Sequence, residues 1–343
     1  MDVREALLAV GARLPAGWNV DLRAERGREP TLSLRAPDGR VARLRVFVRK
    51  QIQPRDVPNL LRQAVGSGGC ALVVAPFLSP RSREMLALGG ASYVDATGNL
   101  RLVVSDPAVF FDARGADRDP DRRPRGLRSL KGGVAGRVVR ALCDFVPPYG
   151  VRALAELSST PLGTVSRVVT FLEREALLNR DADKQIIDVD WAALLARWAA
   201  DYGVATSNAR RSYLEPRGLA ALGAKLGRLD RYAATGSLAG PGIAATRLAV
   251  LYVDDAPRAA EVLELVPAEA GANVWLLEPF DDVVFDRTAR RSPMGSPGAP
   301  PVVVASPSQV AVDLLTSPGR GPQEAEALIE WMKGAEDDWR RRP

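Results

Sequence analysis

A stretch that cannot fold alone constrains this chain more than any other feature. Residues 113–132, ARGADRDPDRRPRGLRSLKG, contain very few apolar side chains and several Pro and Gly. Such a segment buries too little apolar surface to offset its loss of conformational entropy. The rest of the chain, 46% hydrophobic and 26% charged overall, has the composition of a globular protein. We therefore predict a multi-domain α/β protein in which residues 113–132 are a basic linker.

Three folded bodies are expected around this linker. We predict a small α/β domain over residues 1–112, a second domain over 133–203 and an α/β domain over 204–335, with a tail at 336–343. No apolar run reaches the ~18 residues of a membrane helix, and the mixed-charge start does not resemble a signal peptide. We expect a cytoplasmic protein without a membrane partner.

The lack of histidine restricts the possible chemistry. The chain has no His and two Cys, Cys70 and Cys143. This excludes Ser-His-Asp and Cys-His nucleophilic sites, His-ligated zinc and a zinc site built from thiolates of one chain. Catalysis would need carboxylates, Lys, Tyr or a carboxylate-held Mg²⁺. Both cysteines lie in apolar contexts and are predicted to be buried thiols.

The net charge of +6 is unevenly distributed. Residues 1–112 carry +5 and the linker +4, whereas residues 133–190 carry −1 and residues 191–343 carry −2. A basic excess favours phosphate partners. In an Arg-rich composition it is equally compatible with solvated arginines, and both interpretations stay open for residues 1–112.

The first body alternates strands and helices. Apolar and polar residues alternate in the first three segments that we predict to be strands, and residues 71–75 form a short apolar strand. The predicted strands are 20–22, 31–35, 41–48, 71–75, 92–95 and 100–104. Helices are expected over 54–65 and 79–88, the second with Ser79 as N-cap and Pro80 at its first position. Thr97, Gly98 and Asn99 are typical of a hairpin turn.

The second body has the order of a winged helix-turn-helix. Apolar residues recur at helical spacing over 134–145, and Pro147-Pro148 ends that helix. A short helix at 151–157, a turn at 158–161 and a helix at 162–176 follow, and then a hairpin whose second strand is 185–189. In this motif the third helix enters the major groove of double-stranded DNA.

Particular side chains are predicted to contact DNA. The exposed face of the third helix carries three short hydroxyls and one arginine, which suit base edges and phosphates. Those residues are Thr164, Ser166, Arg167 and Thr170. Arg180 and Lys184 on the wing would contact the DNA backbone. The basic linker supplies Arg122, Arg123, Arg125 and Arg128, which could lie along phosphates or enter a minor groove. The alternatives are a winged helix used for protein contacts and a linker that is a solvated spacer.

The third body is predicted to be a mixed α/β domain. Expected helices are 191–202, 213–226, 256–265, 308–315 and 323–332; expected strands are 232–237, 248–253, 272–277 and 302–305. Residues 288–301, rich in Pro and Gly, are predicted to be a surface loop.

Several motifs together resemble a known family. The pattern TVSR followed by FLEREALLNR resembles the recognition helix and wing of many bacterial winged-helix regulators. The later motifs TGSLA, LYVDD, ANVWLLEP, SQVAVDLL and GRGPQEAEALIEWM resemble AbiEi-type antitoxins of type IV toxin–antitoxin systems. The resemblance covers residues 133–335 and implies a winged helix fused to a nucleotidyltransferase-like domain. It also implies a transcriptional regulator that acts as an autorepressor and has a toxin partner; the additional N-terminal domain departs from that pattern.

Two enzymatic interpretations are weaker. A nucleotidyltransferase follows a Gly-Ser turn with Asp-x-Asp, whereas Gly236-Ser237 is followed here by adjacent carboxylates, Asp254-Asp255, which would point to opposite faces of a strand. The first body faintly resembles the PD-(D/E)xK restriction-endonuclease-like fold. Its candidate catalytic strand has Phe47 in place of the acid and Arg49 in place of the Lys. Only Asp21 and Asp95 remain there, so we predict an inactive nuclease-like domain.

The sequence as a whole predicts a non-enzymatic, sequence-specific regulator of transcription that binds double-stranded DNA. We expect no metal or cofactor, and a homodimer, because two-fold operators are the usual targets of such modules. The alternative is a Mg²⁺-dependent nuclease or nucleotidyltransferase guided to DNA by the winged helix.

Overall fold

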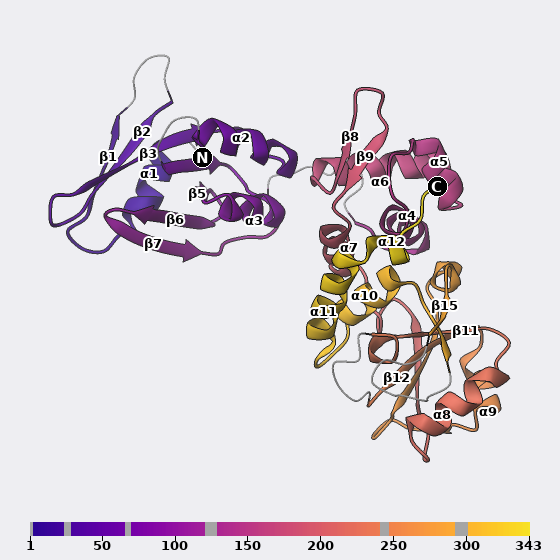
Figure 1. Cartoon of the computed structure of the whole chain (residues 1–343). Helices are drawn as coiled ribbons and strands as arrows, with labels where there is room; N and C mark the ends of the chain where they lie inside the picture. Colours follow the sequence, from indigo (N-terminus) through magenta and orange to yellow (C-terminus); the bar gives the residue numbers. More distant parts are fainter. Residues whose placement is uncertain (1–2, 24–28, 66–69, 121–128, 241–246, 292–300) are drawn as a thin grey trace. The chain divides into compact units, whose positions relative to one another are not determined.

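The computed structural model describes residues 3–23, 29–65, 70–120, 129–240, 247–291 and 301–343. It is a mixed α/β protein with two seven-stranded sheets and one two-stranded hairpin (Figure 1). The chain divides into two compact units, Met1–Arg125 and Gly126–Leu172 with Leu177–Pro343, and Glu173–Ala176 are assigned to the first. No helix in the described ranges has the length and apolar character needed to cross a membrane.

The first unit is a twisted sheet with helices on both faces. Its strands follow one another in sequence order from β1 to β7; β3, β4 and β5 are parallel and the other neighbours antiparallel. The strands are β1 Asn19–Arg23, β2 Thr31–Arg35, β3 Val41–Val48, β4 Cys70–Ala75, β5 Ser92–Asp95, β6 Leu100–Ser105 and β7 Ala108–Ala113. The helices are α1 Val3–Gly11, the 3₁₀ turn η1 Pro54–Asp56, α2 Val57–Val65 and α3 Pro80–Leu88.

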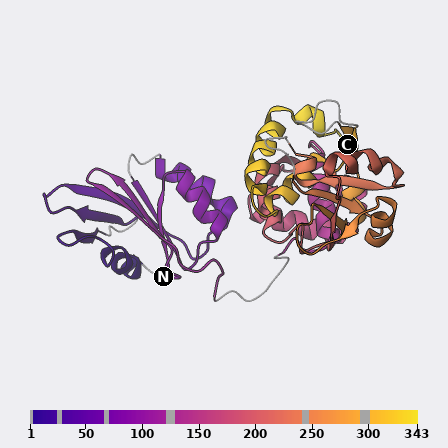
Figure 2. The same cartoon turned by 90° about the horizontal axis from the view of Figure 1, so that it is seen from below.

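Strand β4 shows why this sheet needs cover on both faces. Leu72 and Val74 face a core to which α1 contributes Val10, whereas Val73 and Ala75 face a second core containing residues of α2 and α3. Figure 2 shows α1 and the other two helices on opposite sides of the sheet. A parallel central strand with both faces buried is a nearly continuous apolar run, as CALVVA is.

Most predicted elements of the first unit are confirmed. Strands 31–35 and 41–48 have the predicted bounds, and Ser79 caps α3 by accepting a bond from the Ser82 N–H. The structure adds α1 and β7, which the sequence did not predict. Cys70 corrects another prediction, because it is exposed: it stands at the first position of β4, outside both cores, whereas Cys143 is buried as predicted.

The second unit contains a helical part and a sheet. The helical part comprises α4 Gly133–Asp144, α5 Val151–Leu157, α6 Leu162–Arg174, the hairpin strands β8 Leu178–Arg180 and β9 Ile186–Val189, and α7 Trp191–Ala199. The sheet strands are β10 Ala209–Leu214, β11 Tyr232–Thr235, β12 Ala249–Val253, β13 Val266–Pro267, β14 Val274–Glu278, β15 Ala289–Arg291 and β16 Val302–Val304. The remaining elements are α8 Leu219–Lys225, η2 Leu226–Arg228, η3 Gly236–Leu238, α9 Ala256–Val262, η4 Asp282–Phe285, α10 Pro307–Leu315, α11 Gly321–Gly334 and α12 Glu336–Trp339.

The second sheet has the order β13-β10-β14-β12-β11-β16-β15. The predicted helix 213–226 is wrong in its first part, because Tyr213 lies in β10, where it pairs with Val274 of β14 and Pro267 of β13. Only α8 is helical within that range, together with the η2 turn that follows it. Part of the predicted loop 288–301 also pairs, as strand β15; residues 292–300 lie outside the described part of the chain.

The helical part and the sheet share one core. Leu142 and Val169 of the helical part belong to the same buried cluster as Tyr252 of β12 and Leu314 of α10. The last residues join this core as well. Trp339 is buried and packs edge-on against Trp191, and the Arg340 guanidinium donates to the carbonyls of Cys143 and Phe145.

A fully buried carboxylate sits where α7, the sheet and α10 meet. Asp313 accepts hydrogen bonds from the hydroxyls of Tyr202, Tyr252 and Thr235 at 2.6 to 2.8 Å, and from the Gln309 amide at 3.0 Å. Burial raises the pKa of Asp313 to about 6, although these four donors oppose that shift. Burial also raises the pKa values of Tyr202 and Tyr252, so both hydroxyls keep their protons.

Stability should depend on pH through this carboxyl group. Because folding raises the pKa of Asp313 from 3.8 to about 6, the folded state binds its proton more tightly than the unfolded state. This stabilisation is complete below pH 4 and is lost as the pH rises through 6. We expect the free energy of unfolding of the wild type, relative to Asp313→Asn, to fall by on the order of 3 kcal/mol over that range. Urea titrations of both proteins at several pH values measure it, and a difference independent of pH would contradict it.

Candidate nucleic-acid interface

Helices α4, α5 and α6 and the hairpin β8–β9 form a compact substructure, which we call the helix–hairpin module (Figure 1). The turn between α5 and α6 is fixed by two buried hydroxyls. Ser158 donates to the Leu154 carbonyl at 2.6 Å, and Thr160 donates to the Ser158 carbonyl at 2.9 Å. Helix α6 then starts as the Pro161 carbonyl accepts from the Thr164 N–H. Local side-chain bonds of this kind favour a tight turn over continued helix.

Helix α6 has two distinct faces. Its buried face consists of four residues that are at most 1% exposed: Val165, Val168, Val169 and Leu172. Among the predicted contact residues, Ser166 and Arg167 are exposed and Thr164 and Thr170 are half-buried. At ~100° per residue, Ser166, Arg167 and Thr170 share one side of the helix and Thr164 lies at its margin. The structure therefore brings the four predicted α6 residues together on the solvent side.

Arg167 lies along its own helix. Its Nε donates to the Gly163 carbonyl at 3.2 Å and its Nη2 donates to Thr164 Oγ1 at 3.1 Å. These exposed bonds hold the guanidinium near the start of α6. Guanidinium donors beyond these two remain available to an external acceptor, since Arg carries five N–H groups.

The hairpin is anchored on the α5 side. The N–H and carbonyl groups of Ile186 bond reciprocally to those of Tyr149, next to the start of α5. At the tip, Asp181 accepts from the Gln185 N–H through its carboxylate and from the Lys184 N–H through its carbonyl. Lys184, in the left-handed region at φ 61°, is exposed, and Arg180 is half-buried. The predicted wing cations thus stand on a hairpin that also carries acidic residues.

Four predicted contact residues of the linker lie outside the described residues: Arg122, Arg123, Arg125 and Arg128.

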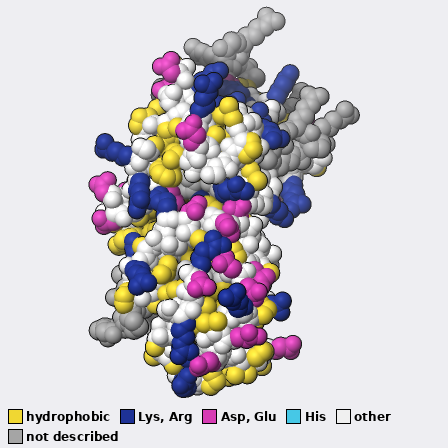
Figure 3. All heavy atoms as spheres, turned by 90° about the vertical axis from the view of Figure 1, so that its right-hand side faces the viewer, with side chains coloured by type: hydrophobic (Ala, Val, Ile, Leu, Met, Phe, Trp, Pro, Cys, Tyr) yellow, Lys and Arg dark blue, Asp and Glu magenta, His cyan; other side chains and the backbone are white. Residues whose placement is uncertain are grey.

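Charge on the second unit is mixed. On the face shown in Figure 3, basic and acidic side chains are interspersed. Binding of a polyanion by this unit would therefore rest on individual residues rather than on a broad basic field.

A buried ion pair within α4 connects the module to the rest of the unit through its hydrogen bonds to other elements. Arg140, 1% exposed, lies 3.1 Å from the Asp144 carboxylate one turn along. Its guanidinium also donates to Ser308 Oγ and Gln309 Oε1 of α10, and to the carbonyl of Val283 in η4. A further bond to the carbonyl of Asp286, just after η4, at 3.3 Å gives each N–H of the guanidinium an acceptor.

Gly136 of α4 allows this helix to pack closely against aromatic side chains in the rest of the unit. A Cβ atom at Gly136 would lie 2.8 Å from Phe280 Cε2 and 3.3 Å from Trp198 Cζ2. Any larger residue would push α4 away from the aromatic rings of Phe280, Trp198 and Tyr202, which pack together with ring centroids 5.0 to 6.3 Å apart. The orientation of α4, and with it of the module, is therefore set by tight packing.

The carboxylates considered for catalysis have structural partners. Asp95 is buried and accepts bonds from the N–H groups of Leu78, Thr97 and Asn99, so it organises the predicted turn. Asp254 pairs with the Arg231 guanidinium, and Asp255 caps α9 by accepting from the Arg258 N–H.

The other nuclease candidates lie apart from Asp95. Asp21 is an exposed residue of edge strand β1, and Phe47 is buried in the core beneath α2 and α3. Arg49, following β3, pairs with Glu29. Within the described ranges, no three Asp, Glu or Cys side chains converge as a metal site would require.

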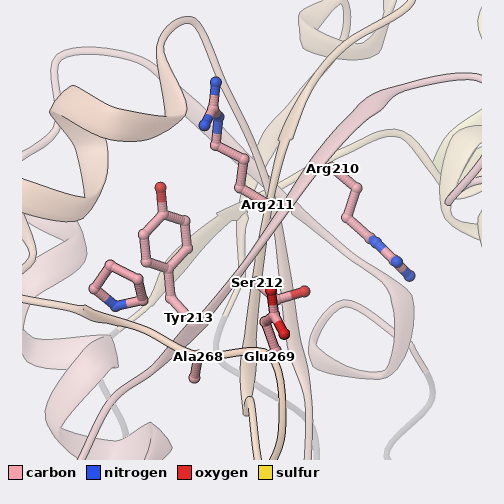
Figure 4. Close-up of a pocket in the computed structure, with 7 residues that line it drawn as sticks. Arg210, Arg211, Ser212, Tyr213, Ala268 and Glu269 are labelled. Atoms are coloured by element: carbon pink, nitrogen blue, oxygen red, sulfur yellow. The ribbon is translucent and has the colours of Figure 1, made fainter.

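An open pocket of about 460 Å³ lies on β10 of the second sheet. It is lined by Arg210, Arg211, Ser212, Tyr213, Pro267, Ala268 and Glu269. Figure 4 shows Arg210 and Arg211 pointing away from each other, as neighbours on a strand do. Arg210 instead lies over the Trp275 ring, 4.6 Å from its centroid. The pocket does not direct both guanidinium groups at one ligand.

The structure adds residues to the module's surface that the sequence reasoning missed. Arg152 of α5 is exposed, as are Leu162, 46% exposed at the start of α6, and Ile187, 48% exposed on β9. The signal for Arg152 was available: in VRALAEL the apolar positions leave Arg152 on the outer face of the helix.

Comparisons with protein-family models, curated proteins and solved structures gave no match to this chain.

Removal of the Arg140 guanidinium should destabilise the second unit. In Arg140→Ala the buried Asp144 carboxylate loses its closest cation and keeps only the Arg287 guanidinium, 3.5 Å away. Breaking a buried ion pair by removing one partner costs up to about 3–5 kcal/mol. Chemical denaturation measures this loss. The matched control is Arg152→Ala on the neighbouring helix, whose exposed side chain should change stability by about 0.5 kcal/mol or less. Equal effects of the two substitutions would contradict the role given to Arg140.

Proposed function

We propose that the helix–hairpin module is a winged helix-turn-helix that binds double-stranded DNA, and that the protein is a sequence-specific transcriptional regulator. The observation that carries the proposal is the division of α6 into a buried valine–leucine face and a solvent face bearing Ser166, Arg167 and Thr170. A helix presented in this way, after a tight turn and before a hairpin, suits the major groove.

The proposed contacts follow from side-chain chemistry. Arg167 would donate two bonds to guanine O6 and N7, and the hydroxyls of Thr164, Ser166 and Thr170 would reach bases or phosphates. The exposed Leu162 could pack on a thymine methyl group. Arg180 and Lys184 would hold the DNA backbone from the hairpin, and the arginines of the 113–132 linker would add sequence-independent affinity.

The remaining parts of the proposal concern the flanking regions. The order α1-β1-β2-β3-α2-β4 supports a nuclease-like first unit that serves binding rather than cleavage, and the second sheet would be nucleotidyltransferase-like. The protein would act in the cytoplasm as a homodimer on a two-fold operator. An antitoxin-like autorepressor with a toxin partner is the specific form that the sequence resemblance favours.

Arg167 is the most informative residue for testing sequence recognition. After a preferred duplex has been selected from a random pool, fluorescence anisotropy compares its affinity with that of a scrambled duplex. Arg167→Ala should weaken binding to the preferred duplex by about 1–3 kcal/mol and narrow the difference between the two duplexes. Arg258→Ala, on α9 in the sheet part of the unit, is the matched control and should leave both affinities unchanged. Unchanged affinity and preference in Arg167→Ala would refute the assignment of α6.

Lys184 should behave as a phosphate contact. Lys184→Ala is expected to weaken binding to preferred and scrambled duplexes alike, because phosphates carry no sequence information. The plot of log affinity against log salt concentration should become shallower by about 1. Anisotropy titrations at four salt concentrations give this slope, and a selective loss for the preferred duplex would assign Lys184 to base contacts instead.

A further inference from the structure

Strand β7 forms one edge of the first sheet and, within the described ranges, lacks the features that protect the other edge strands of the two seven-stranded sheets. Unpaired edge strands are usually short, charged or interrupted by Pro, since an open edge invites pairing. Strand β13 has two residues including Pro267, β15 has three including Arg290 and Arg291, and β1 exposes Asp21 and Arg23. Strand β7, AVFFDA, has six residues, and its one charged side chain, Asp112, is bonded to Arg101 at 2.8 Å.

The outward face of β7 is apolar. Phe110 is 68% exposed, with the Arg101 guanidinium 5.2 Å from its ring centroid, and its neighbours on that face are Ala108 and Asp112. Val109 and Phe111 alternate to the other face, where they pack at the border of the core beneath α1. Apolar side chains are therefore partly or largely exposed on both faces of β7.

The hydrogen bonds of the neighbouring strands determine which residues of β7 point their backbone N–H and C=O groups toward the edge of the sheet. The Val103 N–H donates to Ser92 Oγ at 3.0 Å, and Ser92 Oγ donates back to the Val103 carbonyl, so the backbone of Val103 faces β5. Phe110 stands opposite Val103 in the antiparallel pair and must point its own N–H and carbonyl away from β6. By alternation, Ala108, Phe110 and Asp112 all present these groups to the open edge.

We propose that β7 pairs with β7 of a second copy of this chain in an antiparallel, two-fold symmetric ladder centred on Phe110. In this register every outward-facing residue meets another outward-facing residue: Phe110 meets its counterpart, and Ala108 meets Asp112. The two Phe110 rings stack across the junction, and Val109 pairs with Phe111 on the other face, which are favourable cross-strand pairs. No like charges stand opposite each other, because Asp112 faces Ala108.

A second copy is the occupant that these features favour. Three features of β7 match themselves after a two-fold rotation about Phe110, as an isologous interface requires. They are the residues whose backbone groups face the edge, the ring of Phe110 at the centre, and the position of Asp112 opposite Ala108. The proposal does not depend on DNA binding by α6, so Arg167→Ala should remain a dimer.

The oligomeric state of the full chain tests this proposal. Sedimentation equilibrium should give twice the mass of one chain for the wild type. Phe110→Lys should raise the dimer dissociation constant about 30-fold or more, the effect of losing a central hot-spot side chain. Leu88→Lys is the matched control, since Leu88 is an 81% exposed apolar residue of α3 in the same unit, and it should remain dimeric. A monomeric wild type, or a dimer unaffected by Phe110→Lys, would overturn the proposal.

A cross-link tests the register without relying on the lysine variant. In a hydrogen-bonded antiparallel pair the two Cα atoms lie ~5.5 Å apart, within disulfide range. With exposed Cys70 replaced by Ser, the double variant Ala108→Cys/Asp112→Cys, which keeps Phe110, should form intermolecular disulfides on mild oxidation, whereas Leu88→Cys should not. Equal cross-linking of the two proteins, or none in the double variant, would exclude this pairing.

Discussion

The buried ion pair of Arg140 and Asp144 determines how the second unit is assembled. Two charges removed from water are tolerated only when each finds its full set of partners, and those partners come from α4, α10 and η4 together. Helix α4 therefore cannot turn or slide without exposing or unpairing a charge. Since α5 contacts α4 and α6 shares its apolar core, the direction in which α6 faces solvent depends on a contact made well below the surface.

The same principle recurs at Asp313, where four donors from the segment after α7, the sheet and α10 surround one buried carboxyl group. These two polar clusters and the shared apolar core hold the helix–hairpin module and the second sheet together in one compact unit. A DNA-binding module held in this way would present α6 without the ordering cost that a flexibly tethered module carries. If the module binds DNA as proposed, the mixed charge of this unit means that specificity would depend on a few side chains, Arg167 first among them.

Elements with strong local signals were predicted well. Strand β3 alternates apolar and polar residues over its middle, residues 42–46, and α5 and α6 have apolar residues at helical spacing, so their bounds agree closely with the structure. Strand β10 was missed because ARRSYL has no clear alternation of its own and is a strand only through pairing with β13 and β14. Strand β15 lies in a segment with loop composition and is likewise defined by its partner β16.

By itself, the sequence determined which segments are helices or strands where periodicity is strong, and which residues of α6 face solvent, because both depend on side chains a few positions apart. It also excluded histidine chemistry through composition alone. Only the tertiary structure decided the partners of the buried charges, the exposure of Cys70 and the open edge at β7. These depend on which distant segments meet, and no local pattern encodes that. Arg140 and Asp144 illustrate the division: their spacing is visible in the sequence, but their burial comes from α10 and η4, which lie more than a hundred residues away.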